Sequence, residues 1–222
     1  MFRHAAPPIL AVVLVACLAA SASAGWFDNG VKGSGDLVTQ TYDLDDCHRI
    51  LLRTGLDITV TFGDRQEIAL TVDDNLVELY EIDVQDGRLI IDADKNPRPH
   101  RKTRLEVTLK ALDHLKISGA GDIEIIDVAG EDLELVIDGA GDLEVDGTVT
   151  NLEITVNGAG DIDAKRLEAE HVVVTVNGAG DVAAHASVSA DLTINGVGDI
   201  DIYGKPEQFA QSIHGLGDID RK

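Results

Sequence analysis

The sequence has few cysteines, aromatic residues and positive charges for a chain of 222 residues. Of its two cysteines, Cys17 falls in an N-terminal targeting segment, which leaves Cys47 without a partner for an intramolecular disulfide. We interpret Cys47 as a small buried apolar residue before the strand Ile50-Leu51-Leu52. Stability must therefore come from packing and backbone pairing, or from bound ions.

Positive charge is scarce relative to negative charge. The chain has 18 Lys and Arg residues against 40 Asp and Glu residues, which gives a net charge of −22 at pH 7. This balance excludes nucleic acid and anionic membrane surfaces as general partners, because like charges repel. Cations or basic partners are favoured instead.

No apolar run is long enough to span a membrane comfortably, and the longest run has the features of an export signal. Arg3 precedes an apolar run over residues 9–20 that is too short to span a bilayer comfortably, and Ala22-Ser23-Ala24 is a small-residue cleavage site. We therefore expect residues 1–24 to be a signal peptide, cleaved between Ala24 and Gly25, and the mature protein to be secreted, periplasmic or held in the cell envelope. An alternative remains open, because residues 14–17 resemble a bacterial lipobox. Cys17 would then be acylated, and this anchor would be the protein's means of membrane attachment.

No segment shows a sustained helical period, whereas short bursts of alternating apolar and polar residues recur from residue 37 to residue 109. Within them, Asp86-Gly87 joins two alternating segments, and these residue types tolerate the positive φ angles of a tight hairpin turn. The pattern predicts an N-terminal β region over residues 25–110.

A repeat occupies residues 111–222. The motif Gly-x-Gly-Asp occurs six times there, with spacings of 20, 19, 20, 18 and 19 residues between the first glycines. Gly33-Ser34-Gly35-Asp36 looks like an isolated seventh copy of the same turn. The twelve repeat glycines are Gly119, Gly121, Gly139, Gly141, Gly158, Gly160, Gly178, Gly180, Gly196, Gly198, Gly215 and Gly217.

Alternating arms flank each glycine pair, as in Leu152-x-Ile154-x-Val156 before Gly158. A unit of this size cannot bury its own apolar face, but stacked units bury a continuous column. We therefore predict an all-β fold, a parallel β-solenoid with coils of about 19 residues, preceded by the N-terminal β region packed on it or continuous with it. The glycines form its corners, because they accept positive φ and close backbone approach.

Stacking would place repeated polar residues in columns. One column precedes the glycines and is expected to satisfy corner amides: Ser118, Asp138, Asn157, Asn177, Asn195 and His214. A second column consists of the motif aspartates: Asp122, Asp142, Asp161, Asp181, Asp199 and Asp218. These aspartates could accept hydrogen bonds from corner amides, or they could bind Ca²⁺, which prefers several hard oxygen ligands. No other metal or cofactor is expected.

Several segments resemble a known family. They are "LDITVTFGDRQEIALTVDDN", the hairpin "VQDGRLII", and the strand "RLEVTLKALDH" followed by "LKISGAGDIEI". Together they resemble the bacterial domain of unknown function called the auto-transporter adhesin head, or GIN, domain, over residues 35 to 220. The resemblance implies an extracytoplasmic all-β fold of β-helical character with no established enzymatic activity.

These observations favour a non-enzymatic structural or adhesin-like protein whose partner is a cell-surface protein or polysaccharide. A second hypothesis is a divalent-cation-dependent binding module for cell-surface polysaccharide. A polysaccharide-cleaving enzyme is disfavoured, because the acidic residues recur in every unit whereas catalysis needs one asymmetric group, so we expect no catalytic residue. Aromatic residues that could stack on sugar rings are also few in the repeat, namely Tyr203 and Phe209.

One basic stretch, Lys95 to Arg104, stands out in this acidic chain and is interrupted by Pro97 and Pro99. It could be a solvated loop that joins the two regions. Alternatively, it could be a docking point for the acidic face or for an anionic surface.

Overall fold

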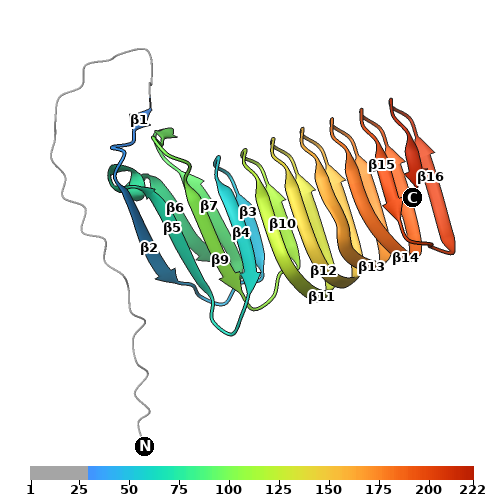
Figure 1. The fold of residues 1–222 in the computed structure, drawn as a ribbon, viewed down its shortest axis with the longest axis horizontal. Helices are drawn as coiled ribbons and strands as arrows, with labels where there is room; N and C mark the ends of the chain where they lie inside the picture. The colour runs from blue at the N-terminus through green and yellow to red at the C-terminus, as the bar shows by residue number, and fades with distance from the viewer. Residues whose placement is uncertain (1–29) are drawn as a thin grey trace, which may run out of the picture.

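The computed structural model describes residues 30–222, and the expected signal peptide and Cys17 lie outside this range. The described chain is built from β-strands and one short 3₁₀ helix, η1 (Asp74–Leu79). The strands run across the long axis of an elongated stack (Figure 1). Within residues 30–222, no helix has the length and apolar character needed to cross a membrane. The all-β prediction is confirmed.

The repeat forms a parallel β-solenoid, as predicted. Each of four long strands bends to follow most of one coil, two shorter strands make up the next coil, and a third short strand begins the coil after it. The long strands are β11 (Ile123–Ile137), β12 (Leu143–Val156), β13 (Ile162–Val176) and β14 (Val182–Ile194), and the shorter ones are β15 (Ile200–Tyr203), β16 (Gln208–Ile213) and β17 (Ile219–Arg221). All pair in parallel, with Ile137 beside Val156 and Val156 beside Val176. Hydrogen-bonded residues of successive coils lie 18 to 20 positions apart, because each coil is one repeat.

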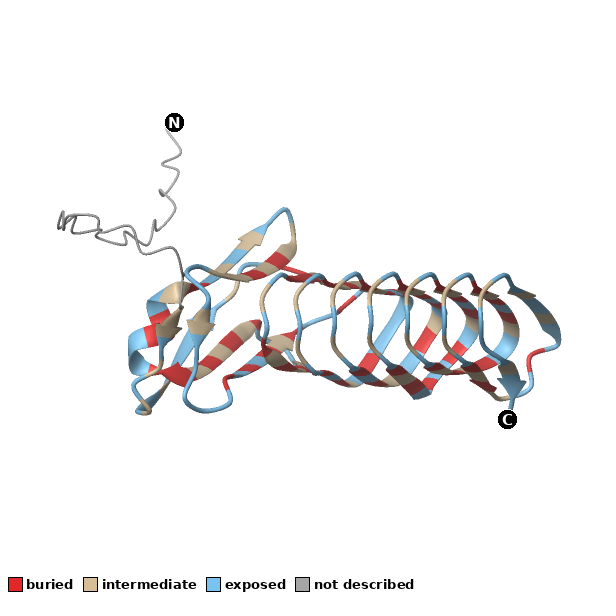
Figure 2. Ribbon diagram, turned by 90° about the horizontal axis from the view of Figure 1, so that it is seen from above, coloured by how far each residue is buried: buried red, intermediate tan, exposed pale blue. Residues whose placement is uncertain are grey.

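The core runs along the inside of the stack, between two walls of strands (Figure 2). Each unit contributes buried residues to both walls and to the bend between them. Ile137 and Ile154 of one wall are 0% exposed, Ile162 of the other is 1% exposed, and Val149 of the bend is 3% exposed. Alternation along the strands puts the polar residues outside, so stacking removes a continuous apolar column from water. This burial is the main stabilising contribution, since Cys47 in the described part of the chain forms no disulfide.

The N-terminal region continues the solenoid. Its strands are β2 (Leu37–Asp43), β3 (Arg49–Leu52), β4 (Asp57–Phe62), β5 (Glu67–Asp73), β6 (Tyr80–Gln85), β7 (Arg88–Ala93), β9 (Arg104–Leu109) and β10 (His114–Ile117), together with the short pair β1 (Val31–Lys32) and β8 (Pro97–Arg98). Strand β3 pairs in parallel with β10, and β4 pairs in parallel with β11. Residues 49–62 therefore form a further coil, and the sheet crosses the boundary drawn at residue 110.

The hairpin turn and the burial of Cys47, both predicted from the sequence, lie in this region. The hairpin at Asp86-Gly87 is confirmed, since φ is 50° at Asp86 and 72° at Gly87 and Gln85 pairs with Arg88. Cys47 is buried, 1% exposed, and its amide donates to Gln66 Oε1 at 2.9 Å. Burial raises the pKa of the Cys47 thiol, which keeps it neutral and apolar.

The assignment of Gly33 to Asp36 as a seventh copy of the corner is wrong. This segment lies against the loop around η1, where the amide of Gly35 donates to Asp73 Oδ1 at 2.6 Å and the amide of Ser34 donates to Asn75 Oδ1 at 2.8 Å. The reason is topological, because β2 pairs antiparallel with β5 and does not enter the parallel stack. A matching Gly-x-Gly-Asp sequence is not sufficient without stacked neighbours.

Candidate functional site

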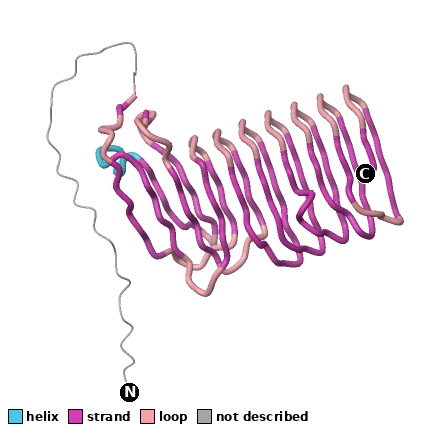
Figure 3. Tube along the Cα trace, viewed as in Figure 1, coloured by secondary structure: helices cyan, strands magenta, loops and turns pink. Residues whose placement is uncertain are grey.

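The glycine pairs lie in loops along one edge of the stack, whereas strand continues around most of the opposite edge (Figure 3). At the first glycine of a pair, a Cβ atom on Gly158 would lie 1.9 Å from the carbonyl oxygen of Gly139. At the second, a Cβ atom on Gly160 would lie 2.0 Å from the oxygen of Gly141, and φ at Gly160 is +159°. The corners therefore require glycine chiefly because successive coils approach so closely there.

The motif aspartates form a column directly after these corners. In the middle of the column, the amide of Asp161 donates to Asp142 Oδ1 at 3.0 Å and the amide of Asp181 donates to Asp161 Oδ1 at 2.8 Å. The same contact joins Asp199 to Asp181 and Asp218 to Asp199. Each of these carboxylates thus accepts the backbone amide of the aspartate in the next coil, which is the amide-capping role considered from the sequence.

A residue outside the repeat begins this column. The amide of Asp122 donates to Asp57 Oδ1 at 3.3 Å, and Cβ atoms on Gly119 and Gly121 would meet the carbonyls of Thr54 and Leu56. Residues 54–57, Thr-Gly-Leu-Asp, therefore form a corner with a single glycine. Asp57 was not among the residues predicted to form the column, although "LDITV" at this corner resembles "GDIEI" at the next one.

The polar column before the glycines is bonded differently from the prediction. Each asparagine of this column donates its side-chain amide to the residue one coil before it, at 2.8 Å. The pairs are Asn157 to Asp138, Asn177 to Asn157 and Asn195 to Asn177. The corner amides bond to backbone instead, as the amides of residues 157 and 158 both donate to the carbonyl of Ile137. The expectation that these side chains satisfy corner amides is therefore wrong, and they form a side-chain ladder that ties coil to coil.

Asp138 is the one carboxylate in the asparagine ladder. Its Oδ1 accepts from Asn157 and its Oδ2 lies 2.5 Å from Lys116 Nζ. The hydrogen bonds from Asn157 and Lys116 hold the pKa of Asp138 below its ordinary value. Asp138 therefore stays ionised near neutral pH and anchors the start of the ladder.

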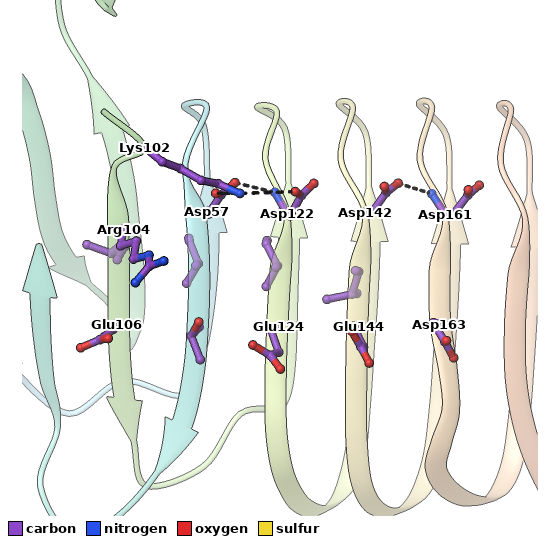
Figure 4. A pocket seen from close by; sticks show the side chains of 15 residues that line it. Asp57, Lys102, Arg104, Glu106, Asp122, Glu124, Asp142, Glu144, Asp161 and Asp163 are labelled. Carbon is purple, nitrogen blue, oxygen red and sulfur yellow. Dashed lines mark hydrogen bonds and ion pairs between the residues drawn. The ribbon is translucent and has the colours of Figure 1, made fainter. Parts of the chain in front are cut away.

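A groove about 680 Å³ in volume runs beside the first four aspartates of the column (Figure 4). Its wall carries the second acidic row, Glu124, Glu144 and Asp163, two positions beyond the column. The row continues at Asp201 and Asp220, two positions beyond Asp199 and Asp218. We call the column from Asp57 to Asp218, together with this row, the acidic ledge.

Basic residues of the 95–104 stretch close one end of the groove. Lys102 Nζ lies 2.5 Å from Asp57 Oδ2 and 4.0 Å from Asp122 Oδ2, and Arg104 lines the same end (Figure 4). Of the two readings of this stretch, docking on the acidic face is the one that the ion pair of Lys102 supports. The concentration of positive charge in this stretch indicated a docking segment, but it did not indicate which of its basic residues contacts the acidic face.

The ledge offers little for redox or nucleophilic chemistry. Its lining contains carboxylates, apolar strand residues, Thr59 and the two basic residues, with no cysteine or histidine. Within residues 30–222, no three His, Cys, Asp or Glu side chains are grouped so that they could hold a metal ion. Along the column, Oδ1 of Asp142, Asp161, Asp181 and Asp199 accepts a backbone amide, which takes one of the acceptor positions of each carboxylate.

A family profile described as "Putative auto-transporter adhesin, head GIN domain" matches residues 46–206. The chain belongs to this family. The match begins within the N-terminal region and includes five of the six glycine corners, as the resemblance noted in the sequence implied. A comparison with curated proteins gave no match.

Solved structures share the fold of this GIN domain protein. A structure described as a "putative adhesin" from Bacteroides fragilis has a TM-score of 0.74 and 26% sequence identity, with 87% of this chain and all of that chain covered. A "putative adhesin" from Parabacteroides distasonis has a TM-score of 0.50 and 20% identity, with 86% and 99% covered. A "Putative lipid binding protein" from the same organism has a TM-score of 0.50 and 21% identity, with the same coverage. The last two likenesses concern the fold alone.

Proposed function

We propose that this GIN domain protein is an exported, non-enzymatic scaffold of the bacterial envelope with an adhesin-like role. The acidic ledge is its contact surface, and the partner is a basic segment of a cell-surface protein. The adhesin description of the family and of its solved relative supports the role. A rigid stack of repeats that exposes one extended charged surface is suited to binding rather than to catalysis.

The observation that carries the proposal is that the chain's own lysines occupy both ends of the ledge, whereas between the ends Lys165 and Arg166 pair with Asp163 and Glu144 of the second row and, within the described chain, leave the column itself unpaired. Lys102 contacts carboxylates of two successive coils, Asp57 and Asp122. At the other end, Lys222 Nζ lies 3.1 Å from Asp201 and 3.2 Å from Asp220, again in successive coils. The spacing of the coils thus lets one ammonium group bridge two acidic residues.

Between these ends the column is open to solvent. In the described part of the chain, no lysine or arginine forms an ion pair with Asp142, Asp161, Asp181 or Asp199. Adjacent carboxylates in this stretch repel one another by less than about 1 kcal/mol per pair in water. A basic partner would relieve that repulsion, so the open stretch favours lysine or arginine side chains arranged along an extended strand.

The experiment measures binding of a peptide of alternating lysine and threonine to the mature chain by biolayer interferometry at 50 and 300 mM NaCl. A ledge variant carries Asp142→Asn, Asp161→Asn and Asp181→Asn. A control variant loses the same three charges at exposed sites outside the ledge, through Asp43→Asn, Asp64→Asn and Glu81→Gln. We expect at least a tenfold loss of affinity in the ledge variant and less than a twofold loss in the control.

Two outcomes would contradict the proposal. Equal losses in the two variants would mean that net charge alone attracts the peptide, since both variants have the same formal charge. Release of reducing sugars in a screen of envelope polysaccharides would show an enzymatic activity that a scaffold does not have. Beads coated with the parent chain should adhere to bacterial cells better than beads coated with the ledge variant, which connects the groove to adhesion.

A further inference from the structure

The outer surface of β7, β3 and β10 carries a group of basic residues on a different wall from the acidic ledge. These strands are parallel neighbours, and their register places Arg88 beside Arg49 and Arg49 beside His114. Two residues further along the strands, Leu51 lies between Ile90 and Lys116. Neighbouring strands are about 4.8 Å apart, and alternate residues along a strand are about 6.7 Å apart.

Leu51 is the centre of this arrangement. Its side chain faces outward from β3, as do those of Arg49 and Arg53, two residues before and two residues after it. It is nevertheless only 8% exposed, because longer side chains surround it. A cavity of about 390 Å³ lies over it. The lining residues are Leu51, Arg53, Arg88, His114, Lys116 and Ser118, which we call the cationic pocket. No carboxylate lines this pocket, in a protein with a net charge of −22.

Arg88, one of the two arginines that line the pocket, lacks an acidic partner among the described residues. In the described chain, Arg88 forms no ion pair, and its Nε is buried without a hydrogen-bond partner. Arg49, which pairs with Arg88 in the sheet but does not line the pocket, also has a buried Nε without a partner, and its guanidinium donates to the carbonyl of Asp86. Buried donors without an acceptor cost free energy, and a ligand that carries acceptor oxygens would recover it.

Nearby carboxylates sit at the rim and are already paired. Arg53 lies 3.8 Å from Asp92, Lys116 pairs with Asp138 on the side of the glycine corner, and His114 Nε2 lies 3.5 Å from Glu134. These contacts hold the ends of the basic side chains around the opening. Arg88 remains as the guanidinium that faces the pocket without a counter-charge.

We propose that the cationic pocket binds a phosphate group. A phosphate monoester carries a charge of about −1.5 to −2 and three acceptor oxygens, which matches two arginines, a lysine and the Ser118 hydroxyl better than a singly charged carboxylate does. The three nearby carboxylates, Asp92, Asp138 and Glu134, each contact a residue of the pocket, whereas Arg88 has no such contact. Negative charges more than about 8 Å away are largely screened at physiological salt. The phosphate is either free or carried on a sugar of the envelope.

The test measures melting temperature with 10 mM inorganic phosphate, glucose 6-phosphate or glucose at constant ionic strength and pH. We expect phosphate and glucose 6-phosphate to raise the melting temperature of the parent by at least 2 °C, and glucose to have no effect. Glucose 6-phosphate binding at least tenfold more tightly than inorganic phosphate, by isothermal titration calorimetry, would identify a phosphorylated sugar as the natural ligand. Equal affinities would identify the phosphate group alone.

Matched variants separate the pocket from general charge effects. Arg88→Gln should abolish at least half of the phosphate-induced shift while leaving the melting temperature without ligand within 2 °C of the parent. Lys205→Gln removes an equal charge at an exposed site of the last coil and should keep the full shift. An unshifted parent in both phosphate ligands, or a full shift in Arg88→Gln, would overturn the proposal. The cationic pocket and the acidic ledge lie on different walls, so the Arg88→Gln variant should bind the lysine peptide as the parent does. Failure of the phosphate proposal would therefore leave the proposed function of the ledge intact, and the reverse also holds.

Discussion

The backbone amide of Asp161 donates a hydrogen bond to Asp142 Oδ1 at 3.0 Å, so two like-charged residues of adjacent coils are joined by a favourable contact. The amide dipole offsets part of the carboxylate repulsion, since Oδ1 accepts from a donor while the Asp142 side chain is exposed to water. The relationship recurs at the next coils with Asp181 and Asp199. It shows how the fold itself offsets part of the repulsion along the acidic column, and it leads to the first prediction.

Replacing Asp161 with Asn should change the free energy of unfolding by less than about 1 kcal/mol, because the asparagine carbonyl can accept the amide of Asp181 while repulsion with its neighbours falls. Replacing it with Ala should cost about 1 kcal/mol, the usual net value of one hydrogen bond. Urea unfolding of the three proteins checks both values. Millimolar Ca²⁺ should add little to the melting temperature of the parent, and a calcium-induced rise that disappears in Asp142→Asn/Asp161→Asn would support the cation-binding hypothesis instead.

Gly160→Val should be severely destabilising, by at least about 3 kcal/mol, because a Cβ atom there would lie 2.0 Å from the oxygen of Gly141 and φ is +159°. Thr155→Val is the control at an outward strand position of the same coil, and it should stay within about 0.5 kcal/mol of the parent. Circular dichroism melts compare the two variants, with the soluble yield as a second readout if Gly160→Val does not fold. Equal melting temperatures would show that the corners do not require glycine.

Asp73 gives a prediction about pH. Burial by itself would raise its pKa, but hydrogen bonds from the amides of His100, Gly35 and Arg101 outweigh that effect and hold the pKa below its ordinary value. A depressed folded-state pKa stabilises the fold above the unfolded pKa of about 3.9, and this contribution is lost as pH falls through the folded value. Asp73→Asn should therefore be less stable than the parent at pH 7, and the gap should narrow below about pH 4.

Melting temperatures of both proteins from pH 7 to pH 3 test this, with Asp64→Asn as an exposed control. The comparison between proteins matters more than either curve alone, because protonation also relieves repulsion along the acidic ledge in both. A gap between the parent and Asp73→Asn that stays constant down to pH 3 would show that the ionised Asp73 does not stabilise the loop around η1.

Export gives the last prediction. Expressed with its own leader, the protein should be recovered outside the cytoplasm with Gly25 as its first residue, by N-terminal sequencing. Palmitate labelling that is lost in Cys17→Ser would establish the lipoprotein alternative, in which a lipid chain supplies membrane attachment. Recovery of the uncleaved chain from the cytoplasm would contradict both.

The sequence by itself determined the repeating part of this protein. Because the repeat length equals one coil, every local rule at Gly158 or Asp161 is copied along the stack, and period-two alternation assigns each side chain to the core or to the surface. Hydrophobic burial and glycine geometry therefore sufficed to predict the solenoid, its corners and the aspartate column. The hairpin at Asp86-Gly87 was predictable for the same reason, since its turn chemistry is local.

In the part of the chain that does not repeat, only the tertiary structure determined which residues are neighbours. Residues 54–57 form a corner without the full motif because Gly119 and Gly121 stack on them, while residues 33–36 have the motif and lie elsewhere. The docking of Lys102 on Asp57 and the cationic pocket around Leu51 likewise join strands whose order in the sheet follows from long-range pairing. Local patterns determine which way a side chain faces, but the register between distant strands is set by the closing of the whole core, so its neighbours appear only in the folded chain.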